Sequence, residues 1–157
     1  FNSAVSFGQK TPRDLGKFVF DVLKSKNFSA LDTLTPKSTD IIVILKNKYP
    51  TAKIDTSDRF LKKYEYHDNR FKNICKDLRN DTTEIKMDWE KCTLTKVDFL
   101  EKPSPYQDTT KNSKPILINY LTLHIASEAS TYILEFTEIY FYKGIWKLGE
   151  HVRFKRN

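Results

Sequence analysis

The beginning of the chain carries apolar residues at helical spacing. Thr11, Pro12 and Asp14 form a helix start, because threonine can cap, proline suits the first turn and aspartate is stabilised near the positive end of the helix dipole. The apolar residues that follow recur three or four positions apart: Leu15, Phe18, Val19, Val22 and Leu23. This pattern predicts an amphipathic helix that ends near residue 25.

Three further helices are expected before the periodicity changes. A short one spans residues 28–34 and is stopped by Thr35-Pro36. Residues 38–48 are interpreted as a helix, although the β-branched run from Ile41 to Ile44 would also suit a strand. Between residues 57 and 79 apolar side chains again step by three or four, which predicts a long amphipathic helix.

After residue 83 the apolar positions begin to alternate, as they do in strands. Residues 85–100 are interpreted as one strand with a bulge between Trp89 and Leu94. A polar, proline-containing loop over residues 102–115 follows. Further strands are expected over 116–126, 131–142 and 145–154, with turns at Glu128-Ala129 and Lys143-Gly144.

Helices followed by a meander predict an α+β fold, in which N-terminal helices pack on a curved, mainly antiparallel four-stranded sheet. With 157 residues, 39% of them hydrophobic, the chain suits one domain over residues 1–157, with an irregular segment over 1–10. Its longest apolar run, Ile41 to Leu45, is too short for a transmembrane segment.

Two stretches carry a resemblance to a known superfamily. FVFDVLKSKNFSALDTLTP, residues 18–36, resembles the opening helix pair of the nuclear-transport-factor-like superfamily, also called the cystatin-like or SnoaL-like cone fold. FTEIYFYKGIWKLGEHVRF, residues 136–154, resembles its closing hairpin. The resemblance implies a curved sheet wrapped around a long helix, with a small ligand often held at the open end. The superfamily includes ketosteroid isomerases, SnoaL-like cyclases and many binding modules, so the fold does not decide the function.

The two turns set a register for the sheet. Continued along the strands from Lys143-Gly144, the register pairs Glu135 with Val152. It also brings to one face, expected to point inward, a set of residues that we predict to bind a ligand: Tyr120, Thr122, His124, Glu135, Thr137, Trp146 and Glu150. His151 is expected on the other face, beside Arg153.

This predicted inner cluster contains a histidine, a tyrosine and two carboxylates, and buried polar groups need partners. We favour a non-enzymatic binding module that holds a small, partly apolar ligand or a partner protein, because no recognisable catalytic motif accompanies the cluster. One alternative is a lyase or isomerase with Glu135 or Glu150 as general base and Tyr120 or His124 as hydrogen-bond donor. The other is a purely structural or interaction domain, in which the polar groups bond only to one another.

The opposite sheet face is too apolar to face water as one patch. It holds Leu121, Leu123, Ile125, Leu134, Phe136 and Tyr140. In the resembled superfamily this face is commonly a dimer interface, so a homodimer through it is expected. Coverage by the N-terminal segment or by the helix over residues 38–48 is the alternative.

Charge and glycine content narrow the partners. The net charge is +7, but lysines alternate with acidic residues, which indicates a solvated basic surface and not a nucleic-acid site. Four glycines leave no glycine-rich phosphate loop, and no cofactor is expected.

Two cysteines, Cys75 and Cys92, are too few and too far apart for a zinc site, so no metal is expected. They are either a disulfide or two buried thiols. The only methionine is Met87, and a chain that starts at Phe1 is expected to be an exported protein, periplasmic, surface-anchored or secreted, or else a trimmed one.

Overall fold

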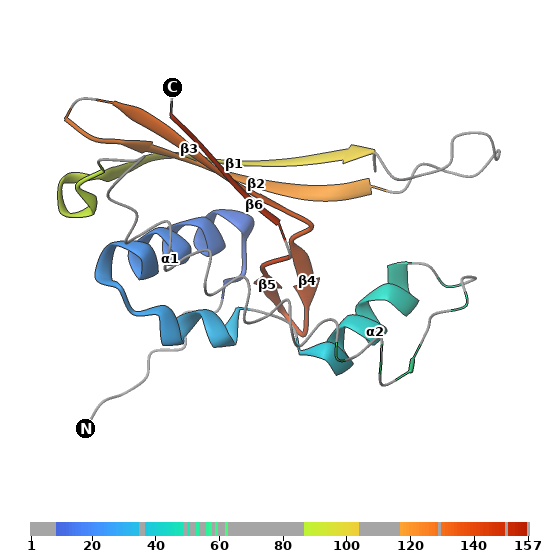
Figure 1. Ribbon diagram of the computed structural model, residues 1–157. Coiled ribbons are helices and arrows are strands. Elements are labelled where there is room, and N and C mark those ends of the chain that lie inside the picture. The colour runs from blue at the N-terminus through green and yellow to red at the C-terminus, as the bar shows by residue number, and fades with distance from the viewer. Residues whose placement is uncertain are drawn as a thin grey trace.

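The structure is a computed structural model that describes residues 9–34, 37–48, 50, 53, 56–57, 59, 62, 87–103, 117–128, 130–149 and 151–156. In this part of the chain helices precede a four-stranded antiparallel sheet, so the predicted α+β class is confirmed (Figure 1). The helix predicted over residues 57–79 falls almost wholly outside the described residues. The cone arrangement around that helix therefore stays a prediction.

Helix α1, Pro12–Ser25, forms as its sequence predicts. The backbone N–H of Asp14 donates to the Thr11 hydroxyl at 3.1 Å, and the Thr11 N–H donates to the Asp14 carboxylate at 3.1 Å, which makes a reciprocal capping box. Lys26, in the left-handed region with φ 60°, ends the helix. One side of α1 is buried, through Leu15, Gly16, Val19, Phe20, Val22 and Leu23.

The next two helical segments differ in kind. The predicted helix near residue 28 is a 3-10 helix, η1, Phe28–Thr33, whose tighter turns suit so short a segment. Helix α2, Ser38–Lys48, confirms the helical interpretation over the strand alternative. Ile41 and Ile44 lie one turn apart in α2 and are both buried, so the β-branched run places its side chains on one buried face of a helix.

The sheet has the order β1-β2-β3-β6, with every neighbouring pair antiparallel. Its strands are β1 Thr93–Pro103, β2 Leu117–Ala126, β3 Thr131–Thr137 and β6 His151–Arg156. The predicted start of the first strand is wrong: Asp88 caps a 3-10 turn, η2, Trp89–Lys91, which occupies that place. The bulge falls between Leu94 and Lys96, after the turn, because the strand begins later.

The Lys143-Gly144 turn forms as predicted, but the strands predicted over 131–142 and 145–154 are each interrupted, and β4 Tyr140–Tyr142 and β5 Ile145–Lys147 form a separate hairpin. The register beyond it is shifted by one residue. Residues 138–139 join β3 to β4, whereas residues 148–150 join β5 to β6. The predicted pairing of Glu135 with Val152 is therefore wrong, and Glu135 lies opposite Arg153.

Glu138 and Gly149 lie where the register shifts between the hairpin and the main sheet. Glu138 adopts φ 62°, the left-handed region. A Cβ on Gly149 would lie 2.2 Å from the Glu138 carbonyl oxygen and 2.5 Å from that of Thr137, so only glycine fits there. The close approach joins the two connecting segments, and it lets the hairpin leave the plane of the main sheet (Figure 1).

The core lies on the sheet face that was predicted to be outside. Helix α1 packs across that face, and the sheet contributes these buried residues to the core: Leu121, Leu123, Ile125, Tyr132, Leu134 and Phe136. The predicted face assignment is therefore wrong. Because these side chains are buried within one chain, they are not available to the dimer interface predicted on this face, and the homodimer stays a prediction.

Leu148 is buried, with 1% of its surface exposed, and its N–H donates to the Leu34 carbonyl at 3.0 Å. Trp146 is half-buried, and its N–H donates to the Gln9 carbonyl at 2.9 Å. The hairpin is thus tied to segments from the beginning of the chain.

Candidate functional site

The predicted ligand-binding residues of β2 and β3 do share a face, which we call the polar face. It is the side of the sheet opposite α1, and it carries Tyr120, Thr122, His124, Glu135 and Thr137. Thr122 lies directly across from Glu135, and Tyr120 lies across from Thr137. Thr137 is buried and the other four are half-buried, and their role in binding a ligand stays a prediction. Glu150 lies outside the described residues.

Strand β1 adds a charged group to the polar face that the sequence reasoning missed. The Asp98 carboxylate accepts from Lys96 Nζ at 2.9 Å, and its other oxygen lies 2.9 Å from His124 Nε2. The hydrogen bond from Lys96, with a further one from His124, holds the pKa of Asp98 below its ordinary value. The Asp98 carboxylate therefore has both of its oxygens paired, one with Lys96 and one with His124.

Trp146 belongs to a different part of the molecule. Its ring packs edge-on against Phe99 of β1, with 5.3 Å between centroids, and is tilted against Phe141 of β4, with 5.4 Å between centroids. Phe99 and Phe141 are nevertheless 40% and 57% exposed. The three rings connect the hairpin to β1, and Trp146 does not join the polar face.

A pocket of about 310 Å³ lies between α2, the ends of β1 and β2, and β4. Figure 1 shows α2 beside the hairpin, below the ends of β1 and β2 that extend past α1. The pocket is lined by Ile44 and Asn47 of α2, Glu101 of β1, Leu117 and Asn119 of β2, and Ile139, Tyr140, Phe141 and Tyr142 on the other side.

The polar wall of this pocket is organised around Asn119. The Asn119 carbonyl accepts from the Ile139 N–H at 3.2 Å, and Asn119 Nδ2 donates to the Ile139 carbonyl at 3.4 Å. Because a carbonyl only accepts, this contact determines which end of the amide faces Ile139. Asn119 Oδ1 is left buried, without a hydrogen-bond partner in the described part of the chain.

The apolar walls of the pocket include side chains that are exposed to water. Leu117 is 44% exposed and Phe141 is 57% exposed, while Ile139 and Ile44 beside them are buried. Exposed apolar groups around a concavity are typical of a binding surface. The pocket thus combines an apolar, aromatic side with a small polar wall.

None of the lining residues was predicted as a site residue. The run Tyr140-Phe141-Tyr142 beside a tight turn was a visible signal for exposed aromatic side chains. Glu101 and Leu117 flank the predicted loop over residues 102–115, and their meeting depends on strand pairing. Ile44 and Asn47 come from a helix far away in the sequence, and no local pattern assigns them to a pocket.

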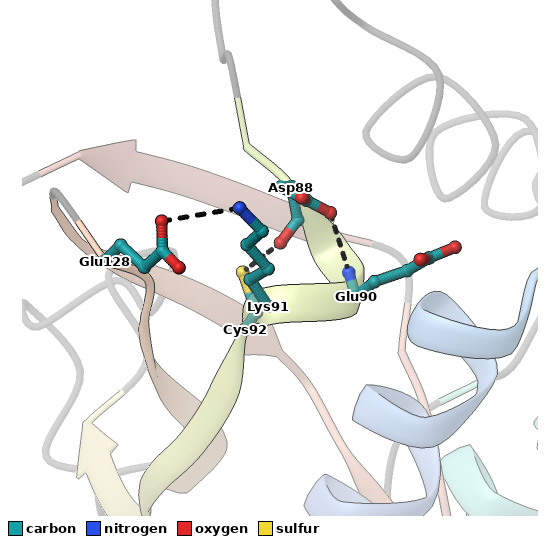
Figure 2. A network of polar contacts seen from close by, with 5 residues as sticks. All are labelled: Asp88, Glu90, Lys91, Cys92 and Glu128. Carbon is teal, nitrogen blue, oxygen red and sulfur yellow. Dashed lines mark hydrogen bonds and ion pairs between the residues drawn. The ribbon is translucent and has the colours of Figure 1, made fainter.

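Cys92 follows η2 at the start of β1. It is buried, and its thiol donates to the Asp88 carbonyl at 3.1 Å, while Lys91 reaches Glu128 at 3.5 Å on the exposed side (Figure 2). Lys24 of α1 donates to the Cys92 carbonyl at 3.0 Å. Cys75 lies outside the described residues, so a disulfide between the two cysteines stays a prediction.

Within the described ranges no three side chains of the metal-binding types come together, and none of the helices there has the length and apolar character needed to cross a bilayer. No protein-family model, curated protein or solved structure matches the chain. The resemblance to the nuclear-transport-factor-like superfamily therefore stays a prediction.

Proposed function

We propose that this protein is a non-enzymatic binding module that holds a small, partly apolar ligand in the pocket between α2 and β4. The observation that carries the proposal is the pocket itself. Its volume of about 310 Å³ is at the lower end of the range of roughly 300 to 1,000 Å³ typical of small-molecule sites. A compact ligand, and not a long chain, suits this volume.

The composition of the walls supports the same proposal. Small-molecule sites are mostly apolar and aromatic, with a few polar groups that orient the ligand. In this pocket Leu117, Phe141 and their neighbours supply the apolar and aromatic surface, and Glu101 and Asn119 supply the polar groups. A ligand would also cover the exposed ring of Phe141, which would remove apolar surface from water.

Two hydrogen bonds favour a pocket that exists before the ligand arrives. The main chain and the side chain of Asn119 both bond to Ile139, the residue that leads into β4. They hold one wall of the pocket to the end of β2. Binding to a wall already in place loses less conformational entropy, which favours affinity.

The polar face is a weaker candidate for the same role. Lys96 and His124 both already bond to Asp98 there, and a ligand would have to replace those contacts. The proposal accordingly moves the binding site from the predicted ligand-binding residues to the pocket.

The proposal is tested by titrating the ¹⁵N-labelled full chain with a panel of small neutral, cationic and anionic aromatic fragments. Binding fragments should shift the amide signals of the lining residues. Phe141→Ala should weaken their binding by about threefold to tenfold, because an aromatic contact of about 0.5–1.5 kcal/mol is lost. Phe99→Ala is the matched control: Phe99 is also exposed and also contacts Trp146, but it does not line the pocket.

Equal losses of affinity in Phe141→Ala and Phe99→Ala would contradict the proposal. So would saturable shifts confined to the polar face. Either result would mean that the pocket is not where the fragments bind.

A further inference from the structure

We infer that the ligand of this pocket carries a cationic amino group, held by Glu101 and Asn119, on an apolar body that packs against β4; this rests on the proposed function. The inference comes from three properties of the lining: its hydrogen-bonding capacity, its charge and its aromatic rings. Each of them favours a donor with positive charge over a neutral or anionic group.

The hydrogen-bonding capacity is biased toward acceptors. Glu101 lies directly opposite Asn119 in the β1–β2 register, so their Cβ atoms are about 4.5–5.5 Å apart. A carboxylate only accepts, and one of the two N–H groups of the Asn119 amide is already committed to Ile139. Asn119 Oδ1, buried and unpartnered among the described residues, needs a donor. An ammonium group brings three donors to one point.

The charge of the lining points the same way. Among the described residues that line the pocket, Glu101 is the only one with a formal charge. Lys143 follows Tyr142 in the sequence but does not line the pocket, and its Nζ is engaged with Asp40 at 3.6 Å. A ligand carboxylate would therefore meet repulsion from Glu101, whereas an ammonium would form a charge-assisted hydrogen bond.

The aromatic residues of β4 complete the site. A cation within about 6 Å of a ring centroid is attracted by the negative face of the ring. The chain already shows this at the same strand, since Lys143 Nζ lies 5.0 Å from the Tyr142 centroid. The Tyr140 hydroxyl donates to Glu138 at 3.1 Å, so its hydrogen is committed and is not offered to an anionic ligand.

The inference is tested with three probes that share one phenyl group and differ in the polar end: 2-phenylethylammonium, 2-phenylethanol and 3-phenylpropanoate. Each is titrated into the ¹⁵N-labelled full chain. The ammonium probe should bind about tenfold more tightly than the alcohol, the size of effect that a hydrogen bond to a charged group gives. The carboxylate probe should bind most weakly.

Glu101→Gln keeps the shape of the side chain and removes its charge. It should abolish the preference for the ammonium over the alcohol, and it should change the affinity for the alcohol less than about twofold. Glu90→Gln is the control: Glu90 is exposed in η2 and does not line the pocket, so this variant should keep the full preference.

The outcomes separate the two proposals. If 2-phenylethanol or 3-phenylpropanoate binds in the pocket as tightly as 2-phenylethylammonium, the inference of a cation is overturned and the binding module remains. The same holds if Glu101→Gln leaves the preference intact. If no probe and no fragment of the wider panel shifts the lining residues, the proposed function falls as well.

Discussion

Replacing Gly16 with alanine tests how closely α1 packs on the sheet. A Cβ at this position would lie 2.7 Å from Val97 Cγ1 and 3.1 Å from Val97 Cγ2. Carbon atoms in favourable contact are about 3.5–4.0 Å apart, so one of the two side chains must move. Val97 is β-branched, and its side chain has few alternative rotamers.

Two opposing effects determine the free energy of unfolding of Gly16→Ala. In a helix interior alanine is more stable than glycine by about 0.5–1 kcal/mol. An extra carbon forced into a packed interface destabilises by about 1–3 kcal/mol. We expect the second effect to dominate, with a net loss of about 0.5–2 kcal/mol. In a Val97→Ala background the clash is absent, and the same substitution should stabilise by about 0.5–1 kcal/mol.

Urea unfolding of the full chain, the two single variants and the double variant measures this change of sign as a coupling free energy of about 1–3 kcal/mol. A coupling below about 0.5 kcal/mol would refute the close approach of Gly16 to Val97. Stabilisation by Gly16→Ala in the wild-type background would refute it too.

Three further predictions follow from single positions. Leu148→Ala should lower the free energy of urea unfolding by about 2–5 kcal/mol, because Leu148 is 1% exposed; a loss below about 0.5 kcal/mol would place it at the surface. Thr11→Ala should lower the same quantity by about 0.5–2 kcal/mol through loss of the cap, and Thr11→Ser should restore most of it; equal losses would argue against the cap. Because the folded-state pKa of Asp98 is lowered, the stability it contributes is complete above its ordinary pKa of about 3.8 and is lost as the pH falls through the lowered value. An NMR titration of the Asp98 carboxyl should show this lowered midpoint, and Lys96→Ala should raise it; an unchanged midpoint in that variant would exclude Lys96 as the main cause.

The parts of the fold that could be predicted are those that local chemistry determines. Thr11 and Asp14 cap α1 through contacts within one turn. Lys143-Gly144 forms its turn because both residues adopt positive φ, 51° and 80°, as a tight hairpin turn of this kind requires. In each case the interacting residues are neighbours in the sequence, so their pattern is sufficient.

The prediction of which sheet face points inward failed because the register was extended along the strands from the Lys143-Gly144 hairpin. The segment between β5 and β6 is one residue longer than the segment between β3 and β4. This extra residue shifts the pairing of β6 with β3 by one position, so every side chain of β6 lies opposite a different residue of β3 from the one predicted. Gly149 was the visible signal of this irregularity. The strength of the apolar pattern at Leu121, Leu123 and Leu134 was a second signal, since these residues are the core that α1 covers.

The pocket could not be predicted from the sequence because its walls meet only in the tertiary structure. Glu101 and Asn119 come together only through the β1–β2 pairing. The commitment of the Asn119 amide to Ile139 depends on how the hairpin leaves the sheet. Neither contact has a local sequence pattern that indicates it.

The most direct test of the binding proposal is a crystal structure of the full chain soaked with a mixture of small aromatic amines and alcohols. We expect fragment density between α2 and β4, in contact with Phe141 and within hydrogen-bond distance of Glu101 or Asn119. Fragments bound on the polar face, with the Phe141 side chain filling the pocket, would contradict the account.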